Sequence, residues 1–201
     1  MTSRREFIQM GVAALALPIS GRAGFSLAQS ALPDAPAPMQ FYKVVFDERF
    51  GAGRAFAAEA QRLGLPLHGI RGDVTSLWYN ELYPRWKQGP VAIAGLTQKA
   101  PLFCLDLLAR DQRMRLAYLG EHVHRSEGHV EHVLSGSPDI LEQARFAETG
   151  PDWTNRLANL MSRFPENCFQ AAAPVIVAPL VGPGDQPEHF VSWVIAPRRA
   201  A

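Results

Sequence analysis

The sequence predicts an α/β fold: a single three-layer domain with a mainly parallel sheet and additional antiparallel hairpin strands. Three observations support this class. Short β-favouring apolar runs alternate with helical patterns between residues 41 and 119. The next segment, 121–134, alternates as two hairpin strands do, and two further apolar runs follow near the end of the chain. A chain of 201 residues is long enough for one substantial core.

The first unit is a strand at 41–46, a helix at 54–63 and a second strand at 65–70. Gly64 ends the helical pattern, because glycine is favoured just after the last helical residue. A strand, a helix of this length and another strand form the pattern of a right-handed parallel crossover. The unit therefore predicts two parallel neighbours.

The second unit repeats this order. We expect Asp73 to cap a helix at 74–86, because a carboxylate at that position accepts hydrogen bonds from the first helical N–H groups. Gly89 and the proline after it end the helix, and a third strand follows at 91–94. This strand extends the predicted parallel sheet.

The third unit contains a helix with a cysteine. We expect Thr97 to cap this helix, which runs to about residue 112 and precedes a fourth strand that begins at 116–119. Cys104 lies among apolar residues and is expected to pack inward as a small hydrophobic side chain. The other cysteine is Cys168, and spacing alone leaves open whether the two form a disulfide.

The C-terminal part departs from the strand and helix alternation. Its predicted elements, in order, are a hairpin at 121–134 with its loop at 125–128, a helix that begins at Ser137 and Pro138, a helix at 153–164 that Pro165 stops, and strands at 174–178 and 190–195 in a mixed sheet.

The hairpin holds four of the six histidines. A four-residue loop centred on 126 and 127 would place three imidazoles and one carboxylate on one face: His122, His124, His129 and Glu131. Such a set can hold zinc or another divalent transition metal, as in a metal-dependent hydrolase. The alternative is a polar hairpin face that contacts water, and a register shift of one residue would separate the four side chains.

A second candidate site lies beyond the carboxyl ends of the parallel strands, where open α/β sheets bind ligands. Asp47, Arg71 and Asp73 follow the first two strands there. A carboxylate and a guanidinium can orient a polar small molecule, with Asp47 as a base, in a small-molecule enzyme without a metal. The alternative is that Asp73 is only a helix cap and Arg71 is solvated. Gly51-Ala-Gly53 lacks the third glycine of a dinucleotide motif.

The N-terminal segment contains Arg4, Arg5 and Phe7, then a mildly apolar run at 10–19 and small residues up to Ala28. This arrangement resembles a twin-arginine export signal. The apolar run is shorter than the roughly 20 residues that a membrane span needs, so we expect no stable membrane span after cleavage.

The resemblance implies a bacterial periplasmic protein that is cleaved after Ala28 and is a substrate of the twin-arginine (Tat) translocase. The domain organisation is then a signal peptide at 1–28, a Pro/Ala-rich tether at 29–38 and a single α/β domain at 39–201. Proteins that use this route fold before export, commonly because they first take up a cofactor or bind a partner.

Composition and motifs bear on which classes of function fit this chain. The 20 Lys and Arg and 19 Asp and Glu nearly balance, so nothing indicates a nucleic-acid partner. No complete catalytic or cofactor motif is present. The leading hypothesis is therefore an accessory or binding subunit that is exported folded together with a redox enzyme, whose larger subunit holds the cofactor. The metal-dependent hydrolase and the small-molecule enzyme are the alternatives.

Overall fold

The structure is a computed structural model of the chain, and it describes residues 37–125, 130–144, 152–166, 175–176 and 189–197. These residues belong to one compact unit, Ala35–Ala201. The predicted signal peptide, with Arg4, Arg5 and Phe7, and most of the predicted tether lie outside the described residues.

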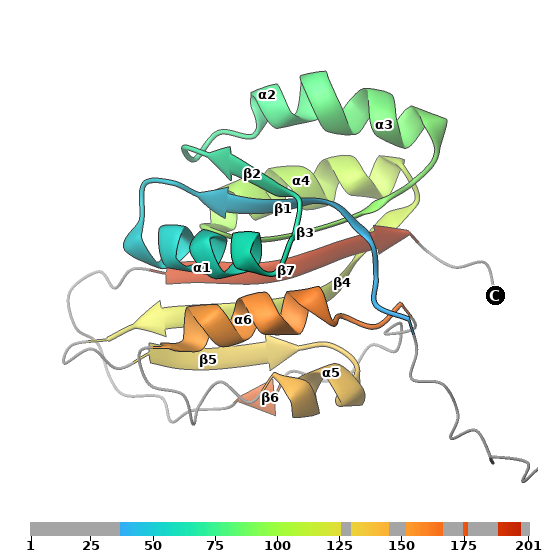
Figure 1. Ribbon diagram of the computed structural model, residues 1–201. Coiled ribbons are helices and arrows are strands. Elements are labelled where there is room, and N and C mark those ends of the chain that lie inside the picture. The colour runs from blue at the N-terminus through green and yellow to red at the C-terminus, as the bar shows by residue number, and fades with distance from the viewer. Residues whose placement is uncertain (1–36, 126–129, 145–151, 167–174, 177–188, 198–201) are drawn as a thin grey trace, which may run out of the picture. The chain divides into compact units, whose positions relative to one another are not determined.

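Within the described residues, seven strands form one mixed sheet in the order β2-β1-β3-β7-β4-β5-β6 (Figure 1). The strands β2, β1 and β3 pair in parallel, and the remaining pairs are antiparallel. The predicted α/β class, with antiparallel strands added to a parallel part, is confirmed. In chain order the strands are β1 Phe41–Asp47, β2 Leu67–Ile70, β3 Ala92–Thr97, β4 Met114–His124, β5 Val130–Ser135, β6 Val175–Ile176 and β7 His189–Pro197.

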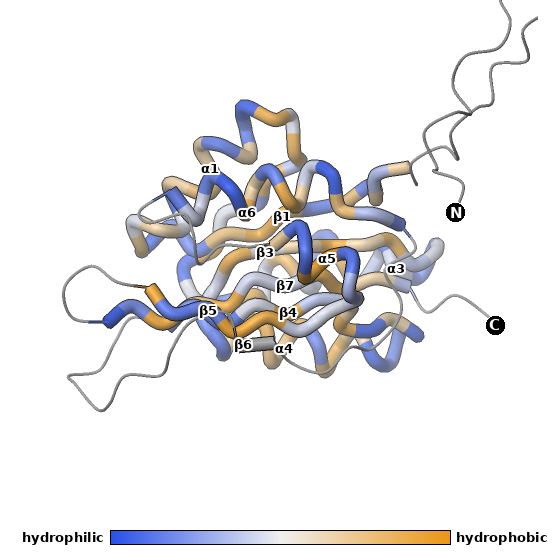
Figure 2. The backbone as a smooth tube through the Cα atoms, turned by 90° about the horizontal axis from the view of Figure 1, so that it is seen from below, coloured by the Kyte–Doolittle hydropathy of each residue, from blue (hydrophilic) through white to orange (hydrophobic). Residues whose placement is uncertain are grey.

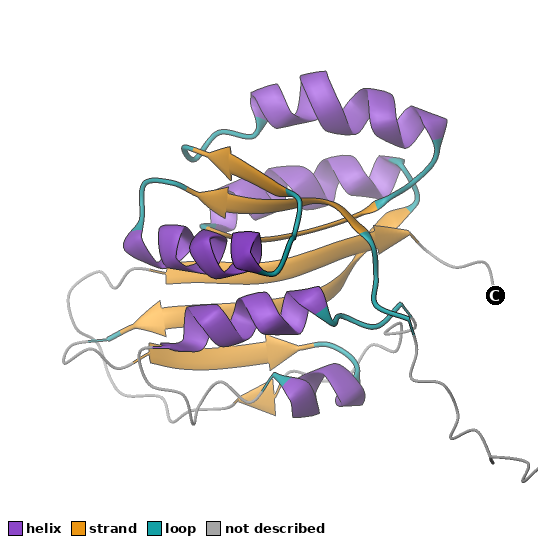
Figure 3. Ribbon diagram, viewed as in Figure 1, coloured by secondary structure: helices purple, strands orange, loops and turns teal. Residues whose placement is uncertain are grey.

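Helices cover both faces of the sheet, which gives three layers (Figure 3). Helices α1, α5 and α6 pack on one face, around a core that includes Phe56 and Leu157. The segment α2-η1-α3 and helix α4 pack on the other, around Leu105 and Trp193. No helix of the described residues is long and apolar enough to cross a bilayer. The bounds are α1 Gly51–Arg62, α2 Thr75–Leu77, η1 Trp78–Leu82, α3 Tyr83–Gln88, α4 Lys99–Asp111, α5 Pro138–Gln143 and α6 Trp153–Ser162.

The last strand among the described residues, β7, lies in the middle of the sheet. Strand β7 pairs with β3 on one side and with β4 on the other, both in antiparallel orientation. Its side chains from Phe190 to Ala196 are all buried. The strand that follows β3 in sequence is β4, but β7 separates the two, so the parallel part is limited to β2, β1 and β3.

Helix α1 begins at Gly51, three residues before the helical pattern predicted from the sequence. Gly53 lies so close to β1 that a Cβ atom there would be 2.3 Å from the carbonyl oxygen of Asp47. Only glycine allows this close approach of the helix to the strand. Gly53 therefore serves the packing of α1 on β1.

The helix predicted at 74–86 is a continuous helical segment from Thr75 to Gln88 with one wide turn. The N–H of Tyr83 donates to the carbonyl oxygen of Trp78, five residues earlier, which defines a π-turn. Pro84 follows directly and has no N–H to donate. The π-turn thus lies where a proline interrupts the regular hydrogen bonding of an α-helix.

Thr97 is not the cap of α4, as the sequence predicted, but the last residue of β3. Gln98 occupies the N-cap position of α4. The Thr97 hydroxyl donates to the Gln98 carbonyl oxygen at 2.9 Å and accepts a hydrogen bond from Trp193 Nε1 at 3.0 Å. Because Thr97 is fully buried, these bonds satisfy its hydroxyl and join β3 to β7.

Candidate functional site

The histidine-rich hairpin forms, but its register differs by one residue from the predicted one. His122 pairs with His132 rather than with Glu131, and His124 pairs with Val130 rather than with His129. Because neighbouring residues of a strand point to opposite faces, Glu131 lies on the face opposite His122 and His124. The prediction that the four candidate ligands share one face is therefore wrong for Glu131. His129 lies outside the described residues.

Two of the hairpin histidines form a buried polar chain with strand β7. His122 Nδ1 lies 2.6 Å from His132 Nδ1, and His122 Nε2 lies 2.7 Å from the Ser192 hydroxyl oxygen. Ser192 in turn donates to the Tyr118 hydroxyl at 3.4 Å. Trp153, the first residue of α6, stacks on the His122 ring at a centroid distance of 4.5 Å. Helix α6 therefore covers this chain on the side away from the sheet.

Burial favours the neutral state of His122. Each of its ring nitrogens lies within hydrogen-bond distance of a group that can donate or accept, the His132 ring on one side and the Ser192 hydroxyl on the other. Burial lowers the pKa of His122 well below its usual range, and the positive charge that His132, His124 and His189 can carry lowers it further. Burial also raises the pKa of Tyr118 far above its usual range.

This chain has the outline of a serine and histidine relay, but its geometry does not suit nucleophilic catalysis. Both Ser192 and His122 are fully buried, so no substrate reaches the hydroxyl. Ser192 is the one polar residue within the apolar run 190–195, and that isolated position is the sequence signal for a buried hydrogen bond.

The remaining hairpin residues belong to two separate environments. The His124 ring makes an edge contact with Phe190 at a centroid distance of 5.7 Å, on the face of the His122 chain. Glu131, on the opposite face, accepts two hydrogen bonds from the Arg125 guanidinium, at 2.9 and 3.0 Å. Among the described residues, no group of three or more His, Cys, Asp or Glu side chains is arranged to hold a metal ion.

An ion pair between Asp47 and Arg49 lies at the carboxyl end of β1. The carboxylate of Asp47 is fully buried and accepts three hydrogen bonds from Arg49: from Nε at 2.9 Å, from Nη2 at 2.7 Å and from the backbone N–H at 3.1 Å. These bonds raise the pKa of Arg49. The guanidinium also bonds to Gln98 at 3.2 Å and lies against Gly72. Both carboxylate oxygens of Asp47 are therefore bonded to Arg49, and Asp47 is not placed to act as a base.

The other two residues predicted for this edge do not join Asp47. Asp73 Oδ1 accepts hydrogen bonds from the Thr75 N–H at 2.9 Å and from the Thr75 hydroxyl at 2.7 Å, and these bonds lower its pKa. Asp73 thus binds the first residue of α2, but Val74 and not Asp73 occupies the N-cap position that the sequence predicted for it. Arg71 is exposed, and no described residue pairs with it. The structure therefore does not bring Asp47 and Arg71 together as an acid–base site.

Helix α4 presents an apolar stripe to solvent. Its inner side contains Leu102, Leu105 and Ala109, all buried. Its outer side contains Ala100, Phe103, Cys104 and Leu107, which we call the α4 stripe, and Phe103 and Leu107 are 69 % and 56 % exposed. In Figure 2, α4 lies on the side of the sheet opposite α1 and α6.

Cys104 is a free, exposed cysteine of this stripe, so the prediction that it packs inward is wrong. The reason is helical geometry, since the residues that face the sheet are 102, 105 and 109 and Cys104 lies on the other side. Cys168, the other cysteine, lies outside the described residues. The stripe repeats at i, i+3, i+4 and i+7, a spacing that the sequence alone displays.

Comparison with known proteins finds no match: no family model, no curated protein and no solved structure is similar to this chain. The geometry of the molecule is therefore the basis for its functional interpretation. Of the surfaces described above, the α4 stripe is the one that has no covering element among the described residues.

Proposed function

We propose that this protein is an accessory protein that is exported folded to the periplasm and binds a protein partner through the α4 stripe. The single observation that carries the proposal is the exposure of the large apolar side chains Phe103 and Leu107 on the outer side of α4. An apolar patch that a protein leaves exposed, with polar residues around it, is typical of a protein interaction site, and the sheet covers only the inner side of α4.

The composition of the stripe suits a protein partner. Its anchors lie at i, i+3, i+4 and i+7, the spacing by which a helix occupies an apolar groove of another protein. Polar residues surround it: Arg110 pairs with Asp106, and Lys99 pairs with Glu121 at 3.0 Å. An apolar centre inside a polar rim is the usual anatomy of a protein interface.

The twin-arginine resemblance favours a partner over a second copy of this chain. That route transports proteins that are already folded, and a subunit that binds its partner before export crosses the membrane with it. The resemblance rests on Arg4, Arg5 and Phe7. A redox enzyme whose large subunit holds the cofactor is the class of partner that we propose.

The test compares Phe103→Lys/Leu107→Lys with the matched control Ala55→Lys/Ala58→Lys, which adds the same charge to exposed positions of α1. The tagged full chain is expressed in the bacterium that encodes it, and the retained protein is identified and purified. We expect this partner to bind the isolated wild-type and control proteins with one-to-one stoichiometry. The α4 variant should bind at least about tenfold more weakly, because two charges enter an apolar contact.

Analytical ultracentrifugation of the purified protein tells whether the α4 stripe binds a different protein or a second copy of this chain. A monomer is expected in the absence of the partner. A dimer that Phe103→Lys/Leu107→Lys dissociates would assign the stripe to a second copy and overturn the proposal. Equal partner binding by the α4 variant and the control would overturn it as well.

A further inference from the structure

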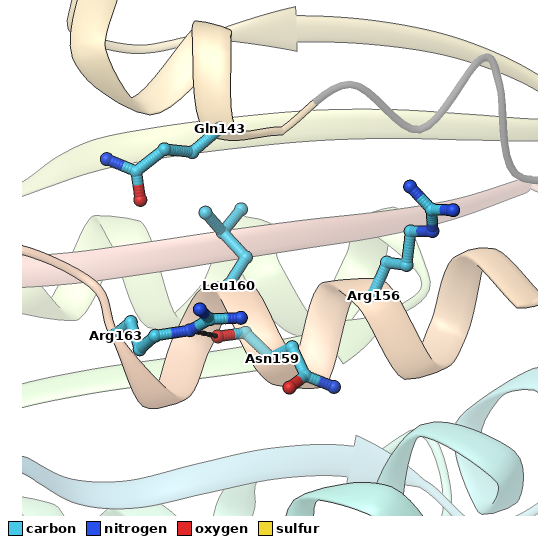
Figure 4. Close-up of a pocket in the computed structure, with 5 residues that line it drawn as sticks. All are labelled: Gln143, Arg156, Asn159, Leu160 and Arg163. Atoms are coloured by element: carbon cyan, nitrogen blue, oxygen red, sulfur yellow. Dashed lines mark hydrogen bonds between the residues drawn. The ribbon is translucent and has the colours of Figure 1, made fainter.

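A groove of about 380 Å³ lies between α5 and α6, on the face of the sheet opposite α4 (Figure 4). Gln143 from α5 lines one side. The other side is lined by Arg156, Asn159 and Leu160 from α6 and by Arg163, which directly follows it. This volume lies within the range of pockets that hold small molecules. The groove is separate from the histidine chain and from the α4 stripe.

The groove contains two positive charges that are not neutralised by an ion pair. Arg156 and Arg163 are both exposed, and neither forms an ion pair with a described residue. Arg163 Nε makes one long hydrogen bond, at 3.5 Å, to the Asn159 carbonyl oxygen. A guanidinium stays charged at any physiological pH. Both arginines can therefore receive a carboxylate through two parallel hydrogen bonds.

Glu59, a carboxylate beside the groove, already has hydrogen-bond partners within the protein. Both oxygens of Glu59 accept hydrogen bonds from Arg62, and one of them also accepts from Asn159 Nδ2 at 3.0 Å. The bond to Glu59 fixes the Asn159 amide, which also donates to the Asn155 carbonyl oxygen. Asn159 is thus a rigid part of the wall, and Gln143 is the amide that remains to donate to a ligand.

The spacing of the two arginines defines the length of the ligand. Arg156 lies in α6 and Arg163 is the residue that directly follows its end, so their Cα atoms are separated by about 10 Å along the helix direction at about 1.5 Å per residue. Leu160 lies between them on the same side and points toward the α5 side of the groove (Figure 4). The lining is therefore cationic at both ends and apolar in the middle.

We infer that this groove binds an elongated ligand with two carboxylates joined by an apolar chain. Arg156 and Arg163 each bind one carboxylate, Leu160 contacts the chain between them, and Gln143 donates to the ligand from α5. Two sources share this chemistry: a free long-chain dicarboxylic acid, and two acidic side chains of a peptide segment. The inference does not depend on the proposed function, because α4 lies on the other face of the sheet.

The test is calorimetric titration of the full chain with suberate, a long dicarboxylate, with succinate, a short one, with sulfate, and with the peptide acetyl-Glu-Ala-Ala-Glu-amide. We expect binding of suberate or of the peptide that is at least tenfold tighter than binding of succinate or sulfate. Tighter suberate binding assigns the groove to a free acid, and tighter peptide binding assigns it to a protein segment.

Arg156→Gln/Arg163→Gln should weaken binding at least tenfold. The control Arg54→Gln/Lys87→Gln removes the same charge from exposed positions outside the groove and should leave binding unchanged. Absence of binding by both long probes, an affinity for both of them no higher than for succinate, or an equal loss in the control would overturn the inference. Circular dichroism of each variant confirms that its fold is intact.

Discussion

At the scale of single residues, burial decides the role of the polar side chains that the sequence indicates as candidate site residues. Asp47 and His122 are both fully inaccessible to solvent, and each has its hydrogen-bonding groups satisfied by neighbours. A buried polar group with all partners in place stabilises one arrangement of the core and is costly when a partner is removed. These residues therefore hold the sheet and its helices together.

The buried neutral His122 predicts a loss of stability in acid. Its pKa is low in the folded protein, whereas in the unfolded chain it takes up a proton near the usual value of about 6.5. The unfolded state thus binds more protons below that pH. The free energy of unfolding should fall as the pH decreases below about 6.5, by up to about 1.4 kcal/mol per pH unit from this residue. Urea unfolding at pH 7, 6 and 5 measures this slope.

Two variants separate the titration of His122 from the loss of its hydrogen bonds. His122→Gln should be less stable than wild type at pH 7, with a shallower dependence on pH. Ser192→Ala keeps the titrating histidine, so it should be less stable at pH 7 with the wild-type slope. A His122→Gln protein whose stability falls as steeply as that of wild type would contradict the assignment.

At the scale of elements, α4 has two apolar sides with different roles. The side with Leu105 packs on the sheet, and the side with Leu107 has no contact of that kind. The sequence shows both sets as apolar residues at helical spacing, and it gives no means to tell the core side from the partner side. The cap that the sequence proposed, Thr97, belongs to β3, so the helix also begins later than predicted.

Leucine-to-alanine substitutions on the two sides of α4 should differ sharply in cost. Leu105→Ala removes a fully buried side chain and should lower the free energy of unfolding by about 2–5 kcal/mol. Leu107→Ala, on the exposed side, should change it by less than about 0.5 kcal/mol. Chemical unfolding of the purified protein measures both. Equal costs would mean that the outer side of α4 is covered within the chain itself.

At the scale of the whole molecule, the position of β7 makes the sheet depend on contacts between distant parts of the chain. The strand lies between β3 and β4, so the sheet is incomplete until residues 189–197 have paired with both. Pairing strands that are distant in sequence is slow, because the entropy of the long intervening chain opposes it. The proposed export of an already folded protein is compatible with such slow pairing.

The segment that we propose as a twin-arginine leader, 1–28, provides the test of export. Arg4→Lys/Arg5→Lys keeps the charge but removes the paired arginines, and we expect the mature protein to disappear from the periplasmic fraction. Arg22→Lys, the same change elsewhere in the leader, should be exported normally. Cell fractionation with an antibody or tag on the folded domain measures both. Undiminished periplasmic protein in the double variant would contradict the proposed route.

The sequence by itself determined the class of the fold, most element positions and the ends of several helices. These features follow from local rules, because hydrophobic periodicity identifies strands and helices and Gly64, Asp73 and Pro165 act on their immediate neighbours. Only the tertiary structure decided the register of the hairpin, the central place of β7 and the outward face of Cys104. Those features depend on contacts between residues far apart in the chain, which compete with local preference and are stabilised by the burial of the whole core.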